Sequence, residues 1–474
     1  MPFAVVDFHS LLSNTWVAFL VILFFGGSIF VHELGHFLAA RRCGVKVERF
    51  SIGFGPAIWS RRGRDGVEYR VSWFPLGGYV LLPQLVDLGP IEGKSEADVK
   101  LLPPVGYGAK MFVFVAGAFF NILLAFALAC IIWVMGQPES NQYATTRIGY
   151  VMPTLDMADG SKVPGPAAEA GLRAGDVVRA IDGQKVTDWF DLAMTLGTGA
   201  GRDGKDRPRA VFTIDRDGQP LDVVLYPRLS GDDKIRKVGI ASAFPLIVSE
   251  VDHGSLAEKA GLKVGDEILR LDDDPMLNDM AFVEHLYSNR DKPVSARVRR
   301  AGQEMTLLFP ARPGMTPTAD FGLAFSSGLH LTHPSPFIQI RDQVTMTFRE
   351  LGSLLNPHSD VGLSKMSGPI GIVHMLSSAA ETGLWAVLSL TVLINVNLAI
   401  LNLLPVPVLD GGQMLFATIG RVRRRALPAN FIVTTQGVFM VLLFSMIIYI
   451  SYFNVRSWAR DVRSDRAAAA AQKP

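Results

Sequence analysis

Cysteine is almost absent from this sequence. Among 474 residues there are two cysteines, and one of them, Cys130, lies inside a long apolar stretch. A fold held together by disulfide bonds is therefore not indicated. An excess of either charge is lacking as well, because 46 Lys and Arg nearly balance 44 Asp and Glu, for a net charge of +2. This balance argues against a nucleic-acid partner, whose binding depends on neutralising phosphates.

A removable signal peptide is also not expected. No positively charged segment precedes the first apolar run, and that run ends in a polar His-Glu-Leu-Gly-His sequence rather than in small residues that mark a cleavage site.

Four stretches of the chain are almost free of charge. They cover residues 16–40, 111–135, 384–404 and 429–453, and Glu33 is the only Asp, Glu, Lys or Arg within them. About 20 such residues suffice to cross a bilayer as a helix. The sequence therefore predicts a polytopic α-helical membrane protein with four transmembrane helices, rather than four buried core helices.

The basic residues predict the topology. One cluster, 41–49, follows the first apolar stretch, and a second, 421–425, lies between the third and the fourth. Loops rich in Lys and Arg stay in the cytoplasm. The N-terminus, the C-terminus and the long region 136–383 then lie on the opposite, extracytoplasmic side. Four arginines in the C-terminal tail argue mildly against this orientation, but the even number of helices favours it.

The region between the second and third apolar stretches contains a repeat. "AGLRAGDVVRAID" at 170–182 returns as "AGLKVGDEILRLD" at 260–272. Each copy places a glycine turn before an alternating strand, which predicts two β-rich modules. The repeat resembles the PDZ domain, in which a glycine loop binds terminal carboxylates and a strand pairs with an extended peptide. The modules either begin at Gly149 and Gly239, or are circularly permuted with their loops at Gly239 and Gly322.

Residues 334–355 have the pattern of an amphipathic helix. Phe337, Ile340, Val344, Phe348 and Leu351 share one face, and charged residues occupy the opposite one. Such a helix either lies on the outer membrane surface or packs against the second module.

The polar sequence at the end of the first apolar stretch indicates a metal site. His32 and His36 are four residues apart, so both imidazoles lie on one face of a helix and can reach one ion. Zn²⁺ suits neutral imidazole, and Glu33 beside it could act as a general base. Ionisable groups at membrane depth cost a few kcal/mol each and usually have a partner or a function. Bound zinc therefore explains the motif better than side chains that reach the headgroups.

A third ligand is expected at the end of the third apolar stretch, which reads "NLAILNLLPVPVLDGGQ". Asp410 is the only carboxylate there. Pro405 and Pro407 interrupt the helix, and irregular backbone at membrane depth needs a protein or aqueous environment. In the predicted topology Asp410 and the two histidines lie at the cytoplasmic ends of their helices, so we expect them to meet.

The ordered combination of these motifs resembles the site-2 protease family of intramembrane zinc metalloproteases. HExxH lies in the first membrane helix, and N-x-x-P-x-P-x-L-D-G is complete from Asn402 to Gly411. Tandem PDZ modules are typical of the bacterial branch represented by the regulator-of-sigma-E protease. One departure is "GAFFN" at 117–121, which keeps Gly117 and Asn121 of the family's Gly-Pro-x-x-Asn but lacks the proline.

The resemblance implies a role for each motif residue. His32, His36 and Asp410 would bind zinc, Glu33 would be the catalytic base, and Asn402 would contact substrate. "YRVSWFPLGGYVLL" at 69–82 resembles the family's membrane re-entrant β-loop. Its Pro75, Gly77 and Gly78 would form the turn, and Gly77, Gly78 and Tyr79 would bind substrate along an exposed edge. A simple cytoplasmic hairpin is the alternative.

The predicted organisation follows from these assignments. We expect nine segments: transmembrane helix 1 (1–40), a cytoplasmic segment with the β-loop (41–110), helix 2 (111–135), PDZ-like domains (136–234 and 235–330), an amphipathic membrane-surface segment (331–383), helix 3 (384–412), helix 4 (426–454) and an extracytoplasmic tail (455–474).

The resemblance also implies a function and a location. The function would be zinc-dependent cleavage of transmembrane segments of membrane-tethered proteins, such as anti-sigma factors or remnant signal peptides, in a bacterial inner membrane. The zinc would lie near the cytoplasmic face, with the PDZ domains and both termini periplasmic. The partners would be single-span membrane proteins and the lipid bilayer, with no nucleic acid. The alternative is a non-catalytic membrane scaffold that binds protein termini through its PDZ modules.

Overall fold

The computed structural model describes residues 15–16, 19–85, 102–157, 160–230, 235–314, 321–360, 362, 366–425 and 427–471. The predictions for residues 1–14, 86–101 and 472–474 lie outside the described residues. The chain divides into two compact units. The first unit comprises Met1–Gln137, His333–Phe348 and Ser364–Pro474, and the second comprises Pro138–Thr332 and Arg349–Leu363.

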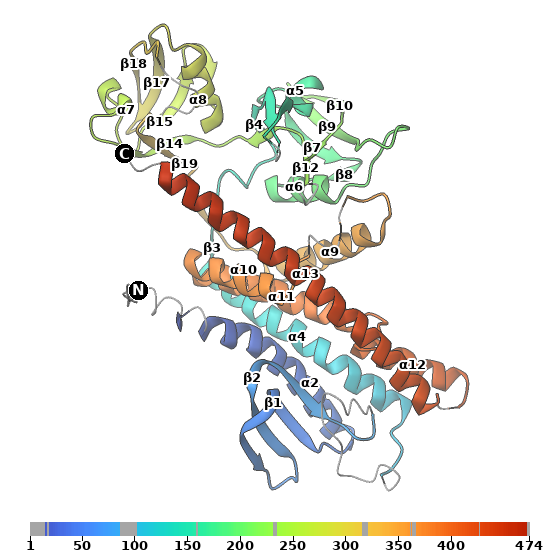
Figure 1. Cartoon of the computed structure of the whole chain (residues 1–474). Coiled ribbons are helices and arrows are strands. Elements are labelled where there is room, and N and C mark those ends of the chain that lie inside the picture. Colours follow the sequence, from blue (N-terminus) through green and yellow to red (C-terminus); the bar gives the residue numbers. More distant parts are fainter. Residues whose placement is uncertain are drawn as a thin grey trace, which may run out of the picture. The chain divides into compact units, whose positions relative to one another are not determined.

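The first unit is mainly helical (Figure 1). Its helices are a π-helical turn η1 (Ile22–Gly26), α2 (Gly27–Arg42), α4 (Tyr107–Met135), α10 (Pro369–Thr382), α11 (Leu384–Asn402), α12 (Asp410–Val422) and α13 (Ala429–Ala471). Four spans are long and apolar enough to cross a membrane, namely Phe19–Arg42, Tyr107–Met135, Leu384–Asn402 and Asn430–Arg456. The four apolar helices predicted from the sequence are confirmed.

The boundaries of two predicted helices are wrong. The third helix was expected to run over 384–412, but α11 ends at Asn402 and α12 begins at Asp410. Pro405 and Pro407 lie in the break, where they cannot continue a helical hydrogen-bond ladder. The fourth helix does not end at 454, because α13 continues through the expected tail to Ala471.

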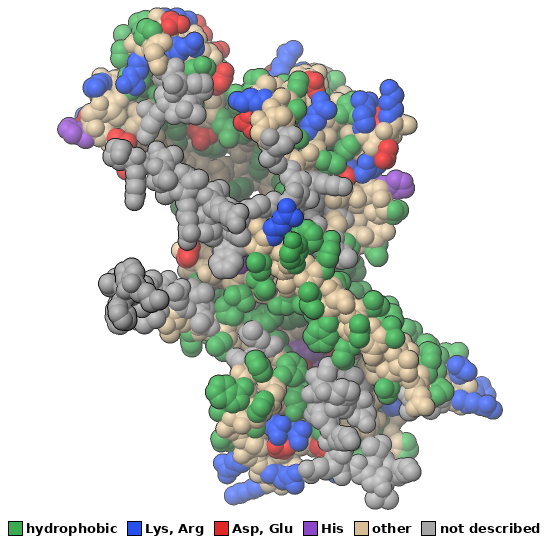
Figure 2. Space-filling model, in the orientation of Figure 1, with side chains coloured by type: hydrophobic (Ala, Val, Ile, Leu, Met, Phe, Trp, Pro, Cys, Tyr) green, Lys and Arg blue, Asp and Glu red, His purple; other side chains and the backbone are tan. Residues whose placement is uncertain are grey.

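Helices α2 and α4 pack closely because glycines lie at their contact. A Cβ atom on Gly35 would lie 2.5 Å from the carbonyl oxygen of Ala116. Small residues allow such close approach of helix backbones in membrane proteins. Helix α4 packs on its other side against α11, through Ala125, Ala129 and Val392. The exposed face of α13 is covered by hydrophobic side chains, including Val441, Leu442 and Ile448 (Figure 2).

The strands β1 (Arg49–Arg62) and β2 (Glu68–Leu81) form a curled sheet beside α2. Residues 49–52 pair with 78–81 on one side and with 68–71 on the other. The chain of β2 therefore reverses between residues 72 and 78, and Gly78 already pairs with Ile52. Phe50 and Val80 pack into a core with Phe37 and Ala40 of α2, which holds the sheet against the helix.

The second unit contains two β-rich modules. The first module consists of β4 (Ile148–Val151), β5 (Thr154–Asp156), β6 (Lys162–Pro164), α5 (Pro166–Glu169), β7 (Val177–Ile181), β8 (Gln184–Lys185), α6 (Trp189–Thr198), β9 (Ala210–Arg216), β10 (Gln219–Leu225), β11 (Arg228–Ser230), β12 (Ile235–Lys237) and β13 (Ile240–Ser242). Its main sheet has the order β10-β9-β7-β8 around a core that includes Phe212 and Ile214.

The second module repeats this plan. It consists of β14 (Leu246–Val251), α7 (Leu256–Ala260), β15 (Glu267–Leu271), β16 (Asp274–Pro275), α8 (Asp279–Ser288), β17 (Val294–Arg300), β18 (Gln303–Phe309) and β19 (Leu323–Ser326). Its sheet has the order β18-β17-β15-β14-β19. A separate pair joins β3 (Gln137–Ser140) to β20 (Leu329–Thr332).

The strand pairing shows where each module ends. β13 follows Gly239 and pairs with β4, while β19 follows Gly322 and pairs with β14. The strand that completes each module thus follows the glycine loop at Gly239 in the first module and at Gly322 in the second. This pairing agrees with the circularly permuted arrangement of the two that the sequence allowed. The predicted boundary after residue 234 consequently falls inside the first module, because β13 forms a two-stranded sheet with β4 of that module.

Helix α9 (Pro336–Leu355) is amphipathic, as the sequence predicts. Its residues Ile340 and Val344 pack against the apolar cluster of α4 and α11. Phe337 is 74% exposed, although its ring contacts Phe126. The placement of this helix on a membrane surface stays a prediction.

The repeated Gly-Asp motif has a structural cause. In the second module Asp266 is buried and accepts two hydrogen bonds from Arg300, at 2.7 Å each, and one from the Lys263 amide at 2.9 Å. Arg300 also donates to the carbonyl of Gly261. Asp176 and Arg216 repeat this arrangement in the first module. Burial would raise the pKa of Asp266, but the hydrogen bonds from Arg300 and Lys263 hold that pKa below its ordinary value.

We expect Asp266→Asn to destabilise the second module by about 3 kcal/mol at pH 7, because Arg300 loses its buried partner. Since the folded-state pKa is lowered, the stabilisation is present above the unfolded pKa of about 3.9 and is lost as the pH falls below it. Hydrogen exchange of the β15 and β17 amides in the full-length protein measures the effect. Exposed Asp273→Asn is the control, and equal protection in both variants would contradict this role.

Candidate metal centre

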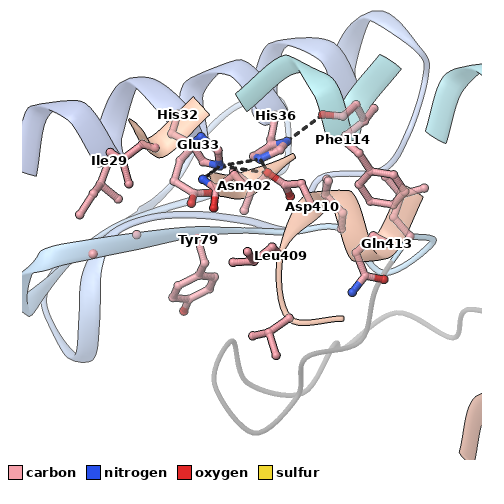
Figure 3. A pocket seen from close by; sticks show the side chains of 18 of the residues that line it. Ile29, His32, Glu33, His36, Tyr79, Phe114, Asn402, Leu409, Asp410 and Gln413 are labelled. Carbon is pink, nitrogen blue, oxygen red and sulfur yellow. Dashed lines mark hydrogen bonds and ion pairs between the residues drawn. The ribbon is translucent and has the colours of Figure 1, made fainter. Parts of the chain in front are cut away.

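Helix α2 carries three of the predicted site residues. His32 and His36 lie one turn apart on one face of α2, and each residue is 8% exposed. Glu33 directly follows His32, and its side chain points into the same region as the two imidazoles (Figure 3). The helix is unbroken from Gly27 to Arg42, so the four-residue spacing alone fixes the two imidazoles side by side.

The turn between α11 and α12 brings the fourth residue to them. The chain leaves α11 at Asn402, passes the two prolines and re-enters a helix with Asp410 as its first residue. A Cβ atom on Gly411 or Gly412 would collide with the carbonyls of Leu403 or Val406. The two glycines therefore permit the tight turn that aims Asp410 at the histidines.

The three ligand atoms form a nearly equilateral triangle. His32 Nε2 lies 3.1 Å from His36 Nε2, and Asp410 Oδ2 lies 3.2 Å and 3.3 Å from these two atoms. Around a tetrahedral Zn²⁺ with bonds of about 2.0–2.1 Å, ligand atoms lie about 3.4 Å apart. Asp410 Oδ2 is also buried without a hydrogen-bond partner among the described residues. The donor set, its spacing and the unpartnered oxygen fit a zinc ion.

Groups on α4 hold the imidazoles in the orientation that a metal requires. His36 Nδ1 donates to the carbonyl of Val113 at 2.8 Å, which leaves Nε2 free for an ion. The amide nitrogen of Asn121 lies 3.3 Å from His32 Nδ1, and its Oδ1 atom is buried without a hydrogen-bond partner among the residues that the structure describes. Exchanging the oxygen and nitrogen of this amide lets Oδ1 accept from His32 Nδ1, which also leaves Nε2 free. Such outer partners orient histidine ligands in metal sites.

Gly117 leaves room for this arrangement. A Cβ atom at position 117 would lie 2.5 Å from His36 Nε2 and 2.8 Å from His32 Nε2. Contacts this short are not tolerated, so any side chain at this position would displace the ligand atoms. Helix α4 can therefore pass directly beside the two imidazoles only if residue 117 is glycine.

A cavity of about 390 Å³ adjoins the triangle. It is lined by the three ligands, Glu33, Asn402 and the segment Gly77–Val80 of β2, among other residues. Asn402 Nδ2 lies 3.4 Å from His32 Nε2. The Glu33 carboxylate accepts a hydrogen bond from the backbone of Val80. A carboxylate and three potential metal ligands thus face one space large enough for part of an extended peptide.

The predicted substrate-binding residues of β2 reach this cavity through their backbone. A Cβ atom on Gly78 would lie 2.9 Å from the carbonyl oxygen of Ser51 and 3.2 Å from Glu33 Cγ, so a side chain at this position would force the sheet or Glu33 to shift. The ring of Tyr79 points away from the histidines and stacks on Phe54 (Figure 3). Its hydroxyl accepts from Arg49 at 3.4 Å.

The structure brings together every site residue that the sequence indicated: His32, Glu33, His36, Gly77, Gly78, Tyr79, Asn402 and Asp410 all line the cavity. The contributions of Val113, Gly117 and Asn121 were not predicted from the residues. The spacing of Gly117 and Asn121 was a signal for them, because four residues place both on the face of α4 that meets α2.

Two buried imidazoles and a carboxylate at metal-ligand spacing lie beside Glu33, among helices that can span a membrane. This combination is typical of an intramembrane metallopeptidase. The chain belongs to peptidase family M50, whose family model matches residues 20–446. It is a zinc metalloprotease of the membrane.

Known relatives resemble the chain over most of its length. The regulator of sigma E protease of Salmonella typhi is 32% identical over 435 residues, covering 87% of this chain and 92% of the relative. A putative zinc metalloprotease of Vibrio cholerae is 32% identical over 441 residues, with the same coverage. The regulator of sigma-E protease RseP of Escherichia coli strain K12 is 31% identical over 442 residues, again covering 87% and 92%.

We expect Gly117→Ala to reduce zinc retention by at least about tenfold, because the added methyl group displaces both imidazole nitrogens and supporting groups of this kind alter metal affinity 10–100-fold. Zinc in the purified, dialysed protein is measured by mass spectrometry. Gly108→Ala on the same helix is the matched control, since its Cβ atom meets nothing within 4 Å. Full zinc in Gly117→Ala would contradict the close approach of α4 to the ligands.

Proposed function

We propose that this chain hydrolyses peptide bonds within the transmembrane segments of membrane-tethered proteins, with Glu33 as general base and with zinc held by His32, His36 and Asp410. The observation that carries the proposal is the triangle of ligand atoms beside Glu33 in one cavity. Ionisable groups at membrane depth are energetically costly, so they usually mark a functional site.

The residues of the cavity suit hydrolysis. His32, His36 and Asp410 would hold a zinc ion that would act as a Lewis acid toward the scissile carbonyl and would lower the pKa of a water molecule. Glu33 accepts the proton of the attacking water and can return it to the leaving amine. Asn402, 3.4 Å from His32 Nε2, lies where its amide can donate to the reacting carbonyl oxygen.

The β-sheet beside the site suits a substrate that must be unwound. A peptide bond inside a helix is shielded by the hydrogen bonds of that helix. Residues 78–81 pair with 49–52 through one edge, and Gly78 and Val80 adjoin Glu33 on the side of the cavity. An extended substrate segment could pair with the edge of residues 78–81 that faces the cavity and so replace the hydrogen bonds of its helix. Gly77, Gly78 and Tyr79 would then bind the substrate through their backbone amide and carbonyl groups.

The charge distribution supports a location in the bacterial inner membrane with the zinc near the cytoplasmic face. Arg41 and Arg42 close α2 just beyond the histidines, and Arg423, Arg424 and Arg425 follow α12. Positively charged ends of this kind stay in the cytoplasm. The two β-rich modules would then be periplasmic PDZ-like domains, and 69–82 would be a re-entrant loop.

The names of the relatives suggest a substrate class. Two of the three relatives described above are called regulator of sigma-E protease, so membrane-tethered anti-sigma factors are the substrates we propose for this chain. We propose that the PDZ-like pair excludes proteins that retain a large outer domain, with binding of chain ends as the alternative role.

We expect Glu33→Gln to abolish cleavage while zinc stays bound, because the amide keeps the shape of the side chain but cannot accept a proton. Asp410→Asn should lose both cleavage and stoichiometric zinc, because its Oδ2 atom is a corner of the ligand triangle. Cleavage of a single-span substrate in membranes and zinc content of the purified protein are measured for both variants. Turnover by Glu33→Gln at the wild-type rate would remove Glu33 from its role, and full zinc in Asp410→Asn would point to another ligand.

A further inference from the structure

A second cavity, of about 270 Å³, lies where α4 meets α12 and the start of α13. Two of its lining residues are charged, Lys110 of α4 and Arg421 of α12, and neither forms a salt bridge with another residue in the described part of the chain. Apolar side chains line most of the rest, among them Val105, Phe416 and Ile432. The cavity therefore places two cations beside an apolar wall.

Tyr107 holds the two cations near each other although they belong to different helices. The hydroxyl of Thr418 donates to the carbonyl of Met414 at 2.7 Å, so the hydroxyl of Tyr107 donates to Thr418 Oγ1 at 3.1 Å. The guanidinium carbon of Arg421 lies 5.7 Å from the centroid of the Tyr107 ring, within the range of a cation–π contact. Lys110 follows Tyr107 by three residues and therefore lies on the same face of α4.

Helix stability does not explain both cations. Arg421 lies in the last turn of α12, where the helix dipole favours a positive charge. Lys110 lies near the first residue of α4, where the dipole disfavours a positive charge. Two like charges that face one cavity also repel each other. An anion between Lys110 and Arg421 removes both penalties.

The cavity lies at the ends of two apolar spans. One span, Tyr107–Met135, begins with a residue that lines the cavity, and another, Asn430–Arg456, begins two residues before Ile432, which also lines it. Helices that cross a bilayer leave its hydrocarbon core near their ends, where the lipid headgroups lie. Basic pockets between transmembrane helices bind the headgroups of anionic lipids. The chemistry that suits this cavity is thus a phosphate ester that carries an apolar chain.

An acidic peptide segment is the other ligand that the two charges would accept. Phe114 and Gln413, which are labelled in Figure 3, line both this cavity and the metal cavity, so the two cavities are neighbours. The position at the span ends favours the lipid, as does the exposed side chain of Arg421, which can be reached from the headgroup layer. Phe416 and Ile432 also suit an acyl chain, whereas an acidic peptide does not need them.

We propose that Lys110 and Arg421 bind the phosphate of an anionic phospholipid and that the apolar wall of this cavity holds the first part of one acyl chain. The phosphate lies between the two cations, and the chain packs against Phe416 and Ile432. Because Phe114 separates this cavity from the metal cavity, the bound lipid lies next to the metal centre. This inference concerns the first unit alone and does not depend on the zinc chemistry.

The test uses the full-length protein in detergent and native mass spectrometry with phosphatidylglycerol and phosphatidylcholine of the same acyl chains. We expect one molecule of phosphatidylglycerol to bind more tightly than phosphatidylcholine. The double variant Lys110→Gln and Arg421→Gln should bind phosphatidylglycerol about 25-fold more weakly, because each basic residue near a lipid phosphate contributes about fivefold. Arg424→Gln with Arg425→Gln is the matched control, since it removes two exposed charges of the neighbouring segment that do not line the cavity, and it should behave as wild type.

Equal affinity of the wild type and the Lys110→Gln, Arg421→Gln variant for phosphatidylglycerol would overturn the proposal. Displacement of the lipid by equimolar inorganic phosphate, or by an equimolar dodecapeptide of alternating Glu and Gly, would overturn it as well, because the site would then bind a free anion or a peptide. Lys110→Arg with Arg421→Lys keeps both charges and should retain the lipid, which separates loss of charge from a disturbed fold.

The wild-type protein gives an independent answer through hydrogen exchange in nanodiscs. Replacing phosphatidylcholine by phosphatidylglycerol should slow exchange of the amides of residues 418–422 by at least about threefold, because a bound headgroup stabilises the end of α12. Unchanged exchange of these amides would contradict a lipid site at this position.

Discussion

The packing of the first unit depends on the electrostatic cost of burying His32, His36 and Asp410 close together. Two imidazoles and a carboxylate lie within 3.3 Å of one another, largely out of contact with solvent. Desolvation of such groups is expensive, and Asp410 Oδ2 has no hydrogen-bond partner in the described part of the chain to offset it. A divalent cation bound by all three groups would offset this cost.

Close backbone approach makes the triangle possible. Gly35 and Gly117 let α2 and α4 approach closely, and Gly411 and Gly412 let α12 turn back on the end of α11. Van der Waals packing through small residues is a main source of helix association in a bilayer, where apolar burial contributes little. The same approach places the Val113 carbonyl and the Asn121 amide on the outer nitrogens of the histidines. Helix packing and metal geometry therefore depend on the same positions.

Local patterns predicted most of the site, and long-range pairing explains what they missed. The spacing of His32 and His36 is a property of one helix. The prolines before Asp410 indicate the helix break that directs Asp410 toward the two histidines. By contrast, β13 lies beyond the predicted end of the first module, because its partner β4 is about 90 residues away and no local pattern reveals that pairing. Asn121 was noticed only as part of a family motif, since nothing in its own neighbourhood shows that it meets His32. The end of α11 at Asn402 was also not predicted, because the apolar stretch continues without a charge beyond that residue.

The coordination of the metal in the purified protein tests the central claim most directly. X-ray absorption at the zinc edge should show one zinc per chain with two imidazoles and carboxylate or water oxygens at about 2.0–2.2 Å. A sulfur ligand at about 2.3 Å would implicate a cysteine instead and would contradict the assignment of His32, His36 and Asp410. Absence of imidazole scattering would contradict it equally.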